Sequence, residues 1–367
     1  LHGALMHFAD LRKADLRGAK LIGASLVSAN LRGAKLGGKR KRATRDARQA
    51  IWCGTTCAGA DLTSANLTNA DLTGVDLTGA KLTSANLTRA NLTNAVLTGA
   101  DITNANFAYA DLTGVVSGRM IGTPLGTVPA GYVFASGLII GPGANLTGYD
   151  LTDVDLSGIN LTNAILTNAK VDGANFAGAT LIGIRSGGVE GAPMALPSGW
   201  TLVNGYMIGP KADLSDANFV WSDLTGVDVS GANLSGANFT QATLTRINVD
   251  GADFTNATLT AVTSGGVSGV PAALPAGWLF ANGYFIGYAA FLDNANLAGL
   301  DLSGLDLTAT SFSNANLSNV NFTNTNLTYG YFANANLTGA TTTGWNITQA
   351  TWRSTTCPNG TVKNSPC

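Results

Sequence analysis

Charged side chains are scarce in this chain. Asp, Glu, Lys and Arg make up 12% of its 367 residues, about half of the share that is usual in soluble globular proteins. Disorder is nevertheless excluded, because hydrophobic residues reach 45% and the formal net charge is only −1, whereas disordered chains combine low hydrophobicity with high net charge. No apolar run approaches the roughly 18 residues of a membrane-spanning helix, so we expect no membrane span.

Histidine is scarcer still, since His2 and His7 are the only two in the sequence. A catalytic site needs acids, bases or nucleophiles within reach of one another, and the sequence has neither a Ser/His/Asp order nor a zinc-ligand spacing. Its glycine-rich stretches do not open helices, so they indicate turns rather than phosphate-binding loops. The sequence therefore predicts a protein that is not an enzyme and that binds no cofactor or metal ion.

The few charges are divided unevenly along the chain. Residues 1–52 contain twelve Lys or Arg and three Asp, a net charge of +9, while the rest contains nine basic and nineteen acidic residues, a net charge of −10. The densest basic stretch holds Lys39, Arg40, Lys41 and Arg42. It is either a solvated loop or short helix, or a contact for a polyanion. Nucleic acid is a disfavoured partner, because no aromatic residues are interleaved with these charges.

A five-residue repeat dominates the remaining sequence. From Ala60 the chain reads ADLTS-ANLTN-ADLTG-VDLTG, and a large apolar residue returns at every fifth position from Leu62 to Leu112. Residues two apart in an extended segment point the same way, so Ala60 and Leu62 face inward and Asp61 faces outward. The next two residues turn the chain into another wall. Walls stacked about 4.8 Å apart bury the apolar residues, and stability comes from the stacking of successive repeats.

This A-(D/N)-L-x-x pattern resembles the pentapeptide-repeat family. The resemblance implies an all-β fold, a right-handed quadrilateral parallel β-helix. It covers most of the chain in five blocks, whose apolar positions run through residues 1–36, 62–112, 146–181, 214–259 and 292–337.

The repeats and their interruptions predict the domain organisation. A basic N-terminal repeat block occupies residues 1–36, a basic cysteine-containing insertion 37–59, the main solenoid 60–352 and a C-terminal cap 353–367. Insertions interrupt the main solenoid at 117–143, 186–211 and 264–289. The sequence leaves open whether residues 1–52 continue the main solenoid.

The three insertions in the main solenoid resemble one another. Each has a Pro-x-Gly-aromatic step, then two short apolar runs joined by a turn, which is Asn-Gly in two of the three. This pattern predicts three β-hairpins, either projecting from the solenoid or folded against it. The aromatic residues of the steps, Tyr132, Trp200 and Trp278, are either packed locally or form a row of contacts for a partner.

Four cysteines lie in two pairs. Cys357 and Cys367 flank a turn-rich C-terminal stretch, and Cys53 and Cys57 lie in the first insertion. We predict disulfides within each pair and therefore an oxidising compartment, although crosslinks between chains remain an alternative. The start at Leu1, without Met, favours a processed N-terminus. We therefore expect a bacterial protein that is extracellular or lies on the cell surface.

Three functions are open at this stage. The favoured one is a non-enzymatic extracellular structural protein that associates head-to-tail with copies of itself into a filament or surface scaffold, with a cell-surface polyanion or polysaccharide as a further partner. The family resemblance implies the second, mimicry of DNA that inhibits a type II topoisomerase, although the basic N-terminal part departs from that pattern. Columns of Thr after the central Leu suggest the third, an adhesin that binds ice or polysaccharide.

Overall fold

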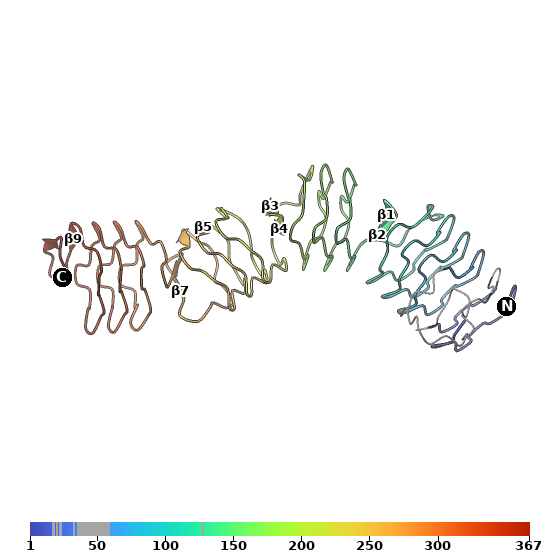
Figure 1. Cartoon of the computed structure of the whole chain (residues 1–367), viewed down its shortest axis with the longest axis horizontal. Helices are drawn as coiled ribbons and strands as arrows, with labels where there is room; N and C mark the ends of the chain where they lie inside the picture. The colour runs from blue at the N-terminus through green and yellow to red at the C-terminus, as the bar shows by residue number, and fades with distance from the viewer. Residues whose placement is uncertain (17–18, 20, 22–23, 32–33, 35–58, 127) are drawn as a thin grey trace, which may run out of the picture. The chain divides into compact units, whose positions relative to one another are not determined.

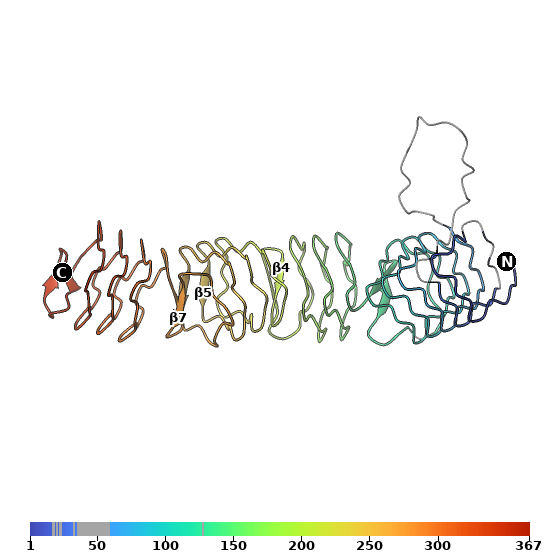
Figure 2. The same cartoon turned by 90° about the horizontal axis from the view of Figure 1, so that it is seen from below.

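A computed structural model describes all residues of the chain except 17–18, 20, 22–23, 32–33, 35–58 and 127. Throughout the described residues the chain winds as successive coils (Figures 1 and 2) without any helix. Parallel bridges join residues twenty apart, as in the series Asp61, Lys81 and Asp101. Each coil therefore contains four five-residue repeats, so the predicted all-β repeat fold is confirmed at this level.

Backbone hydrogen bonds join each coil to both of its neighbours. The Leu62 N–H donates to the carbonyl of Lys81 at 2.8 Å, and the Lys81 N–H donates back to the carbonyl of Ala60 at 2.8 Å. Each corner places one residue in the left-handed region, such as Ser64 at φ 55° or Asn69 at φ 57°. Asn and Gly tolerate this conformation best, which explains why they recur at the fifth position of the repeat.

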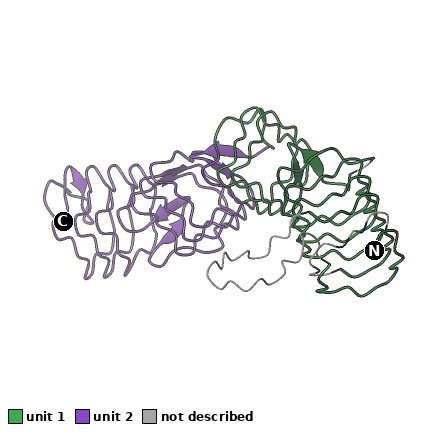
Figure 3. Ribbon diagram, turned by 45° about the vertical axis from the view of Figure 1, so that its right-hand side comes forward, with its two compact units in different colours: residues 1–184, 190–197 green, residues 185–189, 198–367 purple. Residues whose placement is uncertain are grey.

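The chain forms two compact units (Figure 3), residues 1–184 with 190–197 and residues 185–189 with 198–367. In the first unit, the described part of the N-terminal repeats stacks directly on the main repeats, because Ser25 bridges Asn66 and Asn30 bridges Asp71. Residues 35–52, which belong to the same open question, lie outside the described residues. The core of this unit is a column of small Ala and large Leu side chains such as Ala65 and Leu67, both almost fully buried.

In the core of the second unit, aromatic rings stack along the coils. Phe219 lies 5.2 Å from Phe239, measured between ring centroids, and Phe332 lies 4.6 Å from Trp352. The only regular parallel strand pair among the described residues is β5 (Thr243–Thr245) with β6 (Thr263–Gly265).

The three predicted hairpins are confirmed as antiparallel pairs. They are β1 (Val133–Ala135) with β2 (Leu138–Ile140), β3 (Thr201–Val203) with β4 (Tyr206–Ile208), and β7 (Leu279–Ala281) with β8 (Tyr284–Ile286).

The hairpins fold against the coils rather than projecting from them. Their second strands are largely buried. In each hairpin the middle residue of that strand donates its N–H to a buried serine hydroxyl at 2.9–3.0 Å, and the three serines are Ser117, Ser186 and Ser264. The same hydrogen bond to a buried serine therefore anchors all three hairpins.

A fourth antiparallel pair, β9 (Thr355–Thr356) with β10 (Val362–Lys363), closes the C-terminal segment. It is tied to the preceding coil by the Thr355 hydroxyl, which donates to the carbonyl of Phe332 at 2.6 Å. The disulfide between Cys357 and Cys367 joins the two ends of this segment.

Candidate interaction surfaces

The outward Asp or Asn of each repeat organises the turn that follows it. The Asn66 Oδ1 atom accepts a hydrogen bond from the Thr68 N–H at 3.2 Å and another from the Thr68 hydroxyl at 2.6 Å. Asp71 and Thr73 repeat this geometry with 3.0 and 2.6 Å. Such side-chain bonds to the backbone two residues on stabilise turns. The threonine hydroxyls of these turns therefore donate within the repeat rather than to solvent.

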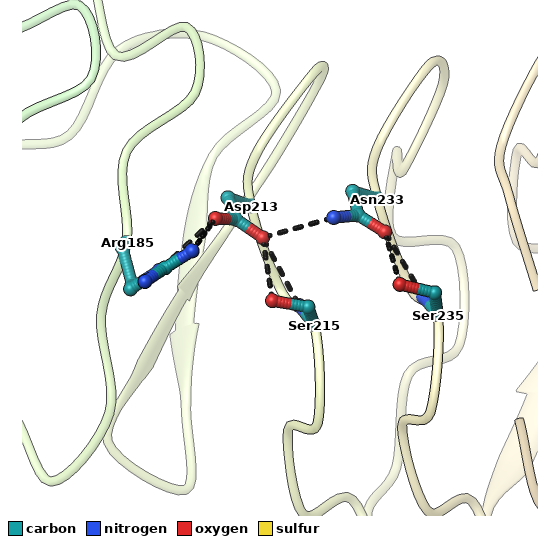
Figure 4. Close-up of polar contacts among 5 residues, drawn as sticks. All are labelled: Arg185, Asp213, Ser215, Asn233 and Ser235. Atoms are coloured by element: carbon teal, nitrogen blue, oxygen red, sulfur yellow. Dashed lines mark hydrogen bonds and ion pairs between the residues drawn. The ribbon is translucent and has the colours of Figure 1, made fainter.

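A second set of bonds links the outward residues of neighbouring coils. The Asn233 amide donates to Asp213 Oδ1 at 3.1 Å, and the Asn321 amide donates to Asp301 Oδ1 at 3.0 Å. Figure 4 shows one such group, in which Arg185, Asp213 and Asn233 lie in line on successive coils. We call these rows the amide ladders.

Arg185 begins the ladder of Figure 4. Its Nε atom donates to Asp213 Oδ2 at 3.0 Å, and Ser215 donates to the other carboxylate oxygen through its hydroxyl at 2.8 Å. Partial burial raises the pKa of Asp213, but the bonds from Arg185 and Ser215 outweigh it and leave the pKa below its ordinary value. This Asp is therefore a fixed anion that holds the surface together.

Hydrogen bonds also lower the pKa of other outward carboxylates. Hydrogen bonds from the Thr255 hydroxyl and N–H lower the pKa of Asp253, and those from Thr103 lower the pKa of Asp101. A general acid or base needs a pKa near the working pH, so these groups are unsuited to proton transfer near neutrality. Within the described residues, no three His, Cys, Asp or Glu side chains gather in a way that could hold a metal ion, and no helix is long and apolar enough to cross a membrane.

The aromatic residues of the hairpin steps are half-buried and pack on glycines of their own hairpins. A Cβ atom on Gly209 would lie 2.2 Å from the Trp200 ring, and one on Gly287 would lie 2.5 Å from the Trp278 ring. Tyr132 covers Gly141 in the same way. These ring faces are thus occupied inside the molecule, as the local-packing interpretation expects, and a partner contact through the remaining exposed atoms stays a prediction.

The other site residues named from the sequence fall into two groups. Cys357 and Cys367 are joined in a disulfide. Cys53 and Cys57, and the basic residues Lys39, Arg40, Lys41 and Arg42, lie outside the described residues, so the second disulfide and the basic contact remain predictions.

Sequence reasoning missed a cluster of exposed aromatic residues in the second unit. Tyr288, Phe291, Tyr329 and Tyr331 are 46, 41, 58 and 38% exposed, and we call them the aromatic edge. The signal was present in the repeat itself: Phe291 and Tyr331 occupy the outward position before the inward Leu292 and Phe332, where most repeats carry Asp or Asn.

Comparison with known proteins gives a single family. The model of pentapeptide repeats matches in eight copies, over residues 1–38, 46–79, 80–116, 143–183, 211–231, 232–262 and 315–351. No curated protein matches the chain.

Two solved structures illustrate what this chain is similar to. One is HetL, a pentapeptide repeat protein involved in heterocyst differentiation regulation from the cyanobacterium Nostoc, with 21% identity over 97% of this chain and 92% of that chain and a TM-score of 0.21. Another is QnrB1, a plasmid-mediated fluoroquinolone resistance protein, with 15% identity over 71% of this chain and 93% of that chain and a TM-score of 0.18. TM-scores this low carry no argument about function. The matched repeats cover well over half of the 367 residues, and the chain therefore belongs to the pentapeptide-repeat family.

Proposed function

We propose that this chain is a non-enzymatic scaffold that works outside the cytoplasm and acts by contacts along its surface, including contacts with further copies of itself. In this proposal the coils form a right-handed, four-sided β-helix. Twenty residues per coil and four repeats per coil support the four sides.

The observation that carries the proposal is the bonding of the outward side chains. Asp, Asn and Thr side chains are tied both within their turns and from coil to coil, as in the pairs Asp301–Ser303 and Asp301–Asn321. Groups held in this way form an ordered polar surface and are poorly placed to rearrange around a reacting substrate. The disulfide between Cys357 and Cys367 supports an oxidising compartment, because such bonds persist mainly outside the cytosol.

Mimicry of DNA is the weaker proposal. A duplex carries one phosphate charge per roughly 1.7 Å of axis. On the coils, carboxylates of one face alternate with neutral residues, as in Asp71, Asn91 and Asp111, which spaces them by two coils, or roughly 9–10 Å. A surface so sparsely charged is a poor copy of the phosphate backbone.

Self-association is testable through salt, because the first 52 residues carry +9 and the rest −10. Charges attract over roughly 30 Å at 0.01 M salt and over only about 3 Å at 1 M. We expect sedimentation velocity and electron microscopy of the oxidised protein to show assemblies at low salt that separate at high salt.

The matched variant neutralises the basic stretch, with Lys39, Arg40, Lys41 and Arg42 all changed to Gln. It should remain monomeric at low salt. Identical single particles of the unaltered protein under both conditions would remove self-association from the proposal.

A further inference from the structure

We infer that the aromatic edge is a binding site for a neutral, extended β-1,4-linked polysaccharide. This inference deepens the proposed scaffold function, on which it rests, by naming a ligand class and the residues that contact it.

The arrangement of the edge follows from the coil register. Phe291 bridges Ser311, which bridges Tyr331, so the two aromatic residues lie on one face two coils apart. A tyrosine precedes each of them at the adjoining corner, but the two occupy different turn positions. Tyr329 takes the position of Ala289 and Ala309, whose N–H groups donate to Thr308 and Thr328, whereas Tyr288 takes the position of Thr308 and Thr328 themselves. Phe291 and Tyr331 thus stand roughly 9–10 Å apart, with the small side chain of Ser311 at the equivalent position between them.

Gly330 lies between Tyr329 and Tyr331 in the chain. It occupies an inward position where most repeats have Ala, and a Cβ atom there would lie 2.9 Å from the Leu327 carbonyl oxygen and 3.0 Å from the Phe332 ring. A side chain at position 330, between Tyr329 and Tyr331, would therefore crowd the interior of the coil.

The few charged side chains around the aromatic edge favour a neutral ligand. Residues 288–352 contain three Asp and no Lys, Arg, Glu or His. Each carboxylate is engaged: Asp293 by Ser313, Asp301 by Ser303 and Asp306 by Thr308. The next residue, Arg353, lies on the coil that follows Tyr331, since its carbonyl accepts the Asn334 N–H. A polyanion would therefore meet one cation at this end of the region and three carboxylates within it, so charge complementarity favours an uncharged chain of hydroxyl groups.

The area of the edge argues against a second protein copy as the occupant. At the exposures given above, four aromatic side chains that each bury 150–250 Å² when covered offer roughly 300–450 Å². A stable protein interface needs about 800 Å² from each partner. The edge is therefore too small for a protein dimer and large enough for a few sugar rings.

The chemistry of the edge matches a glycan chain. A pyranose ring presents C–H groups on its faces, and these are attracted to the negative face of an aromatic ring. In an extended β-1,4-linked glycan every second sugar has the same orientation, so platforms one disaccharide apart contact equivalent faces. Thr308 and Thr328, in the adjoining amide ladder, place hydroxyl oxygens beside the edge, where a sugar hydroxyl can donate to them.

Affinity electrophoresis of the full, oxidised chain in gels containing hydroxyethyl cellulose tests the inference. We expect retardation that is insensitive to salt, because no charges are paired. Tyr331→Ala should weaken binding at least about tenfold, as expected for an aromatic contact that dominates a small site. Tyr109→Ala, which removes an aromatic residue of the first unit that is 77% exposed, should bind as the unaltered protein does.

A variant with altered spacing distinguishes the proposed binding site from nonspecific binding by exposed aromatic residues. Phe291→Ala combined with Ser311→Phe keeps the number of exposed aromatic residues but moves one of them a coil closer to Tyr331. The inference predicts that this variant loses binding at least about tenfold, with circular dichroism confirming that the fold is retained. Equal binding by the spacing variant would overturn it.

Three other outcomes would also overturn the inference. One is an absence of retardation of the unaltered protein in neutral β-1,4-glucan. Another is stronger binding to alginate, a polyanion, that is lost on Tyr331→Ala, which would reject the ligand class while leaving the scaffold function standing. The third is a concentration-dependent dimer that Tyr331→Ala abolishes, which would assign the edge to a second copy of the chain.

Discussion

At most outward positions, Asp and Asn perform the same structural task. The Oδ1 atom of either residue accepts bonds from the residue two further on, as Asp253 does from Thr255 at 2.8 and 2.6 Å and Asn238 does from Thr240 at 3.0 and 2.7 Å. What distinguishes the two residues is charge. An ionised acceptor forms the stronger bond, and only Asp loses this advantage on protonation.

The substitution Asp253→Asn should therefore leave the coil intact and change its response to acid. The pKa of Asp253 in the folded chain is below its ordinary value of 3.8, so the carboxylate contributes stability that is fully present above that value. The contribution is lost as pH falls through the lowered pKa. We expect the variant to melt slightly lower than the unaltered protein at pH 7, by less than about 1 kcal/mol in stability.

As the pH falls below the lowered pKa of Asp253, the two melting temperatures should converge, since both side chains are then neutral. Thermal unfolding followed by circular dichroism from pH 7 to pH 2.5 measures this. A difference in melting temperature that is constant with pH would show that charge on Asp253 contributes nothing.

At the scale of single elements, the hairpins show where sequence patterns suffice and where they do not. Asn204-Gly205 and Asn282-Gly283 predicted the turns between β3 and β4 and between β7 and β8, and these turns are present. The packing of each aromatic step on a glycine nine residues later was not predictable. No local pattern links Trp200 to Gly209 or Trp278 to Gly287, and the contact exists only once the hairpin has closed.

Gly209→Ala should damage one hairpin specifically. The added methyl group would lie 2.2 Å from the Trp200 ring, so the ring must move, and overpacking of this kind costs roughly 1–3 kcal/mol. Hydrogen exchange should accelerate in β3 and β4 while the repeats of the first unit stay protected.

The combined variant Trp200→Ala, Gly209→Ala serves as the control, because it removes the ring that the methyl group meets. Gly209→Ala should cost less in the Trp200→Ala background than in the unaltered chain. Equal costs in both backgrounds would mean that the ring does not require this glycine.

The aromatic edge shows a different limit of sequence reasoning. The repeat phase predicts that Phe291 and Tyr331 point outward, so their exposure followed from the sequence. Their alignment in one column did not follow from the repeat phase alone, because it also requires the number of residues per coil, which only the family resemblance implied. Twenty residues per coil brings Phe291, Ser311 and Tyr331 into one column.

At the scale of the whole molecule, the oxidation state of the cysteines indicates whether an oxidising compartment suits the chain. The disulfide between Cys357 and Cys367 closes a ten-residue separation, and loops of this size contribute roughly 2–3 kcal/mol. Cys357→Ser with Cys367→Ser should lower the melting temperature of the second unit, and a reducing agent should have the same effect on the unaltered protein.

Thiol titration of the denatured, unreduced chain tests the remaining pair. If Cys53 and Cys57 also form a disulfide, as predicted, no thiol reacts. Two reactive thiols per chain would leave Cys357–Cys367 as the only bridge, and four would argue against an oxidising compartment altogether.

The amide ladders also give the coils a direction that formal charge does not describe. The Asn amides that bond across twenty residues donate toward the earlier coil, from Asn175 to Asp155, from Asn248 to Asp228 and from Asn346 to Asn326. Their dipoles are therefore aligned, in the manner of peptide groups along a helix, and an Asp often receives the first bond of a row. A carboxylate can only accept, so exchanging Asp213 with Asn233 would move the amide donor to the earlier coil and reverse the direction of any bond between them. The order of Asp and Asn in successive coils thus carries structural information that a count of either residue does not.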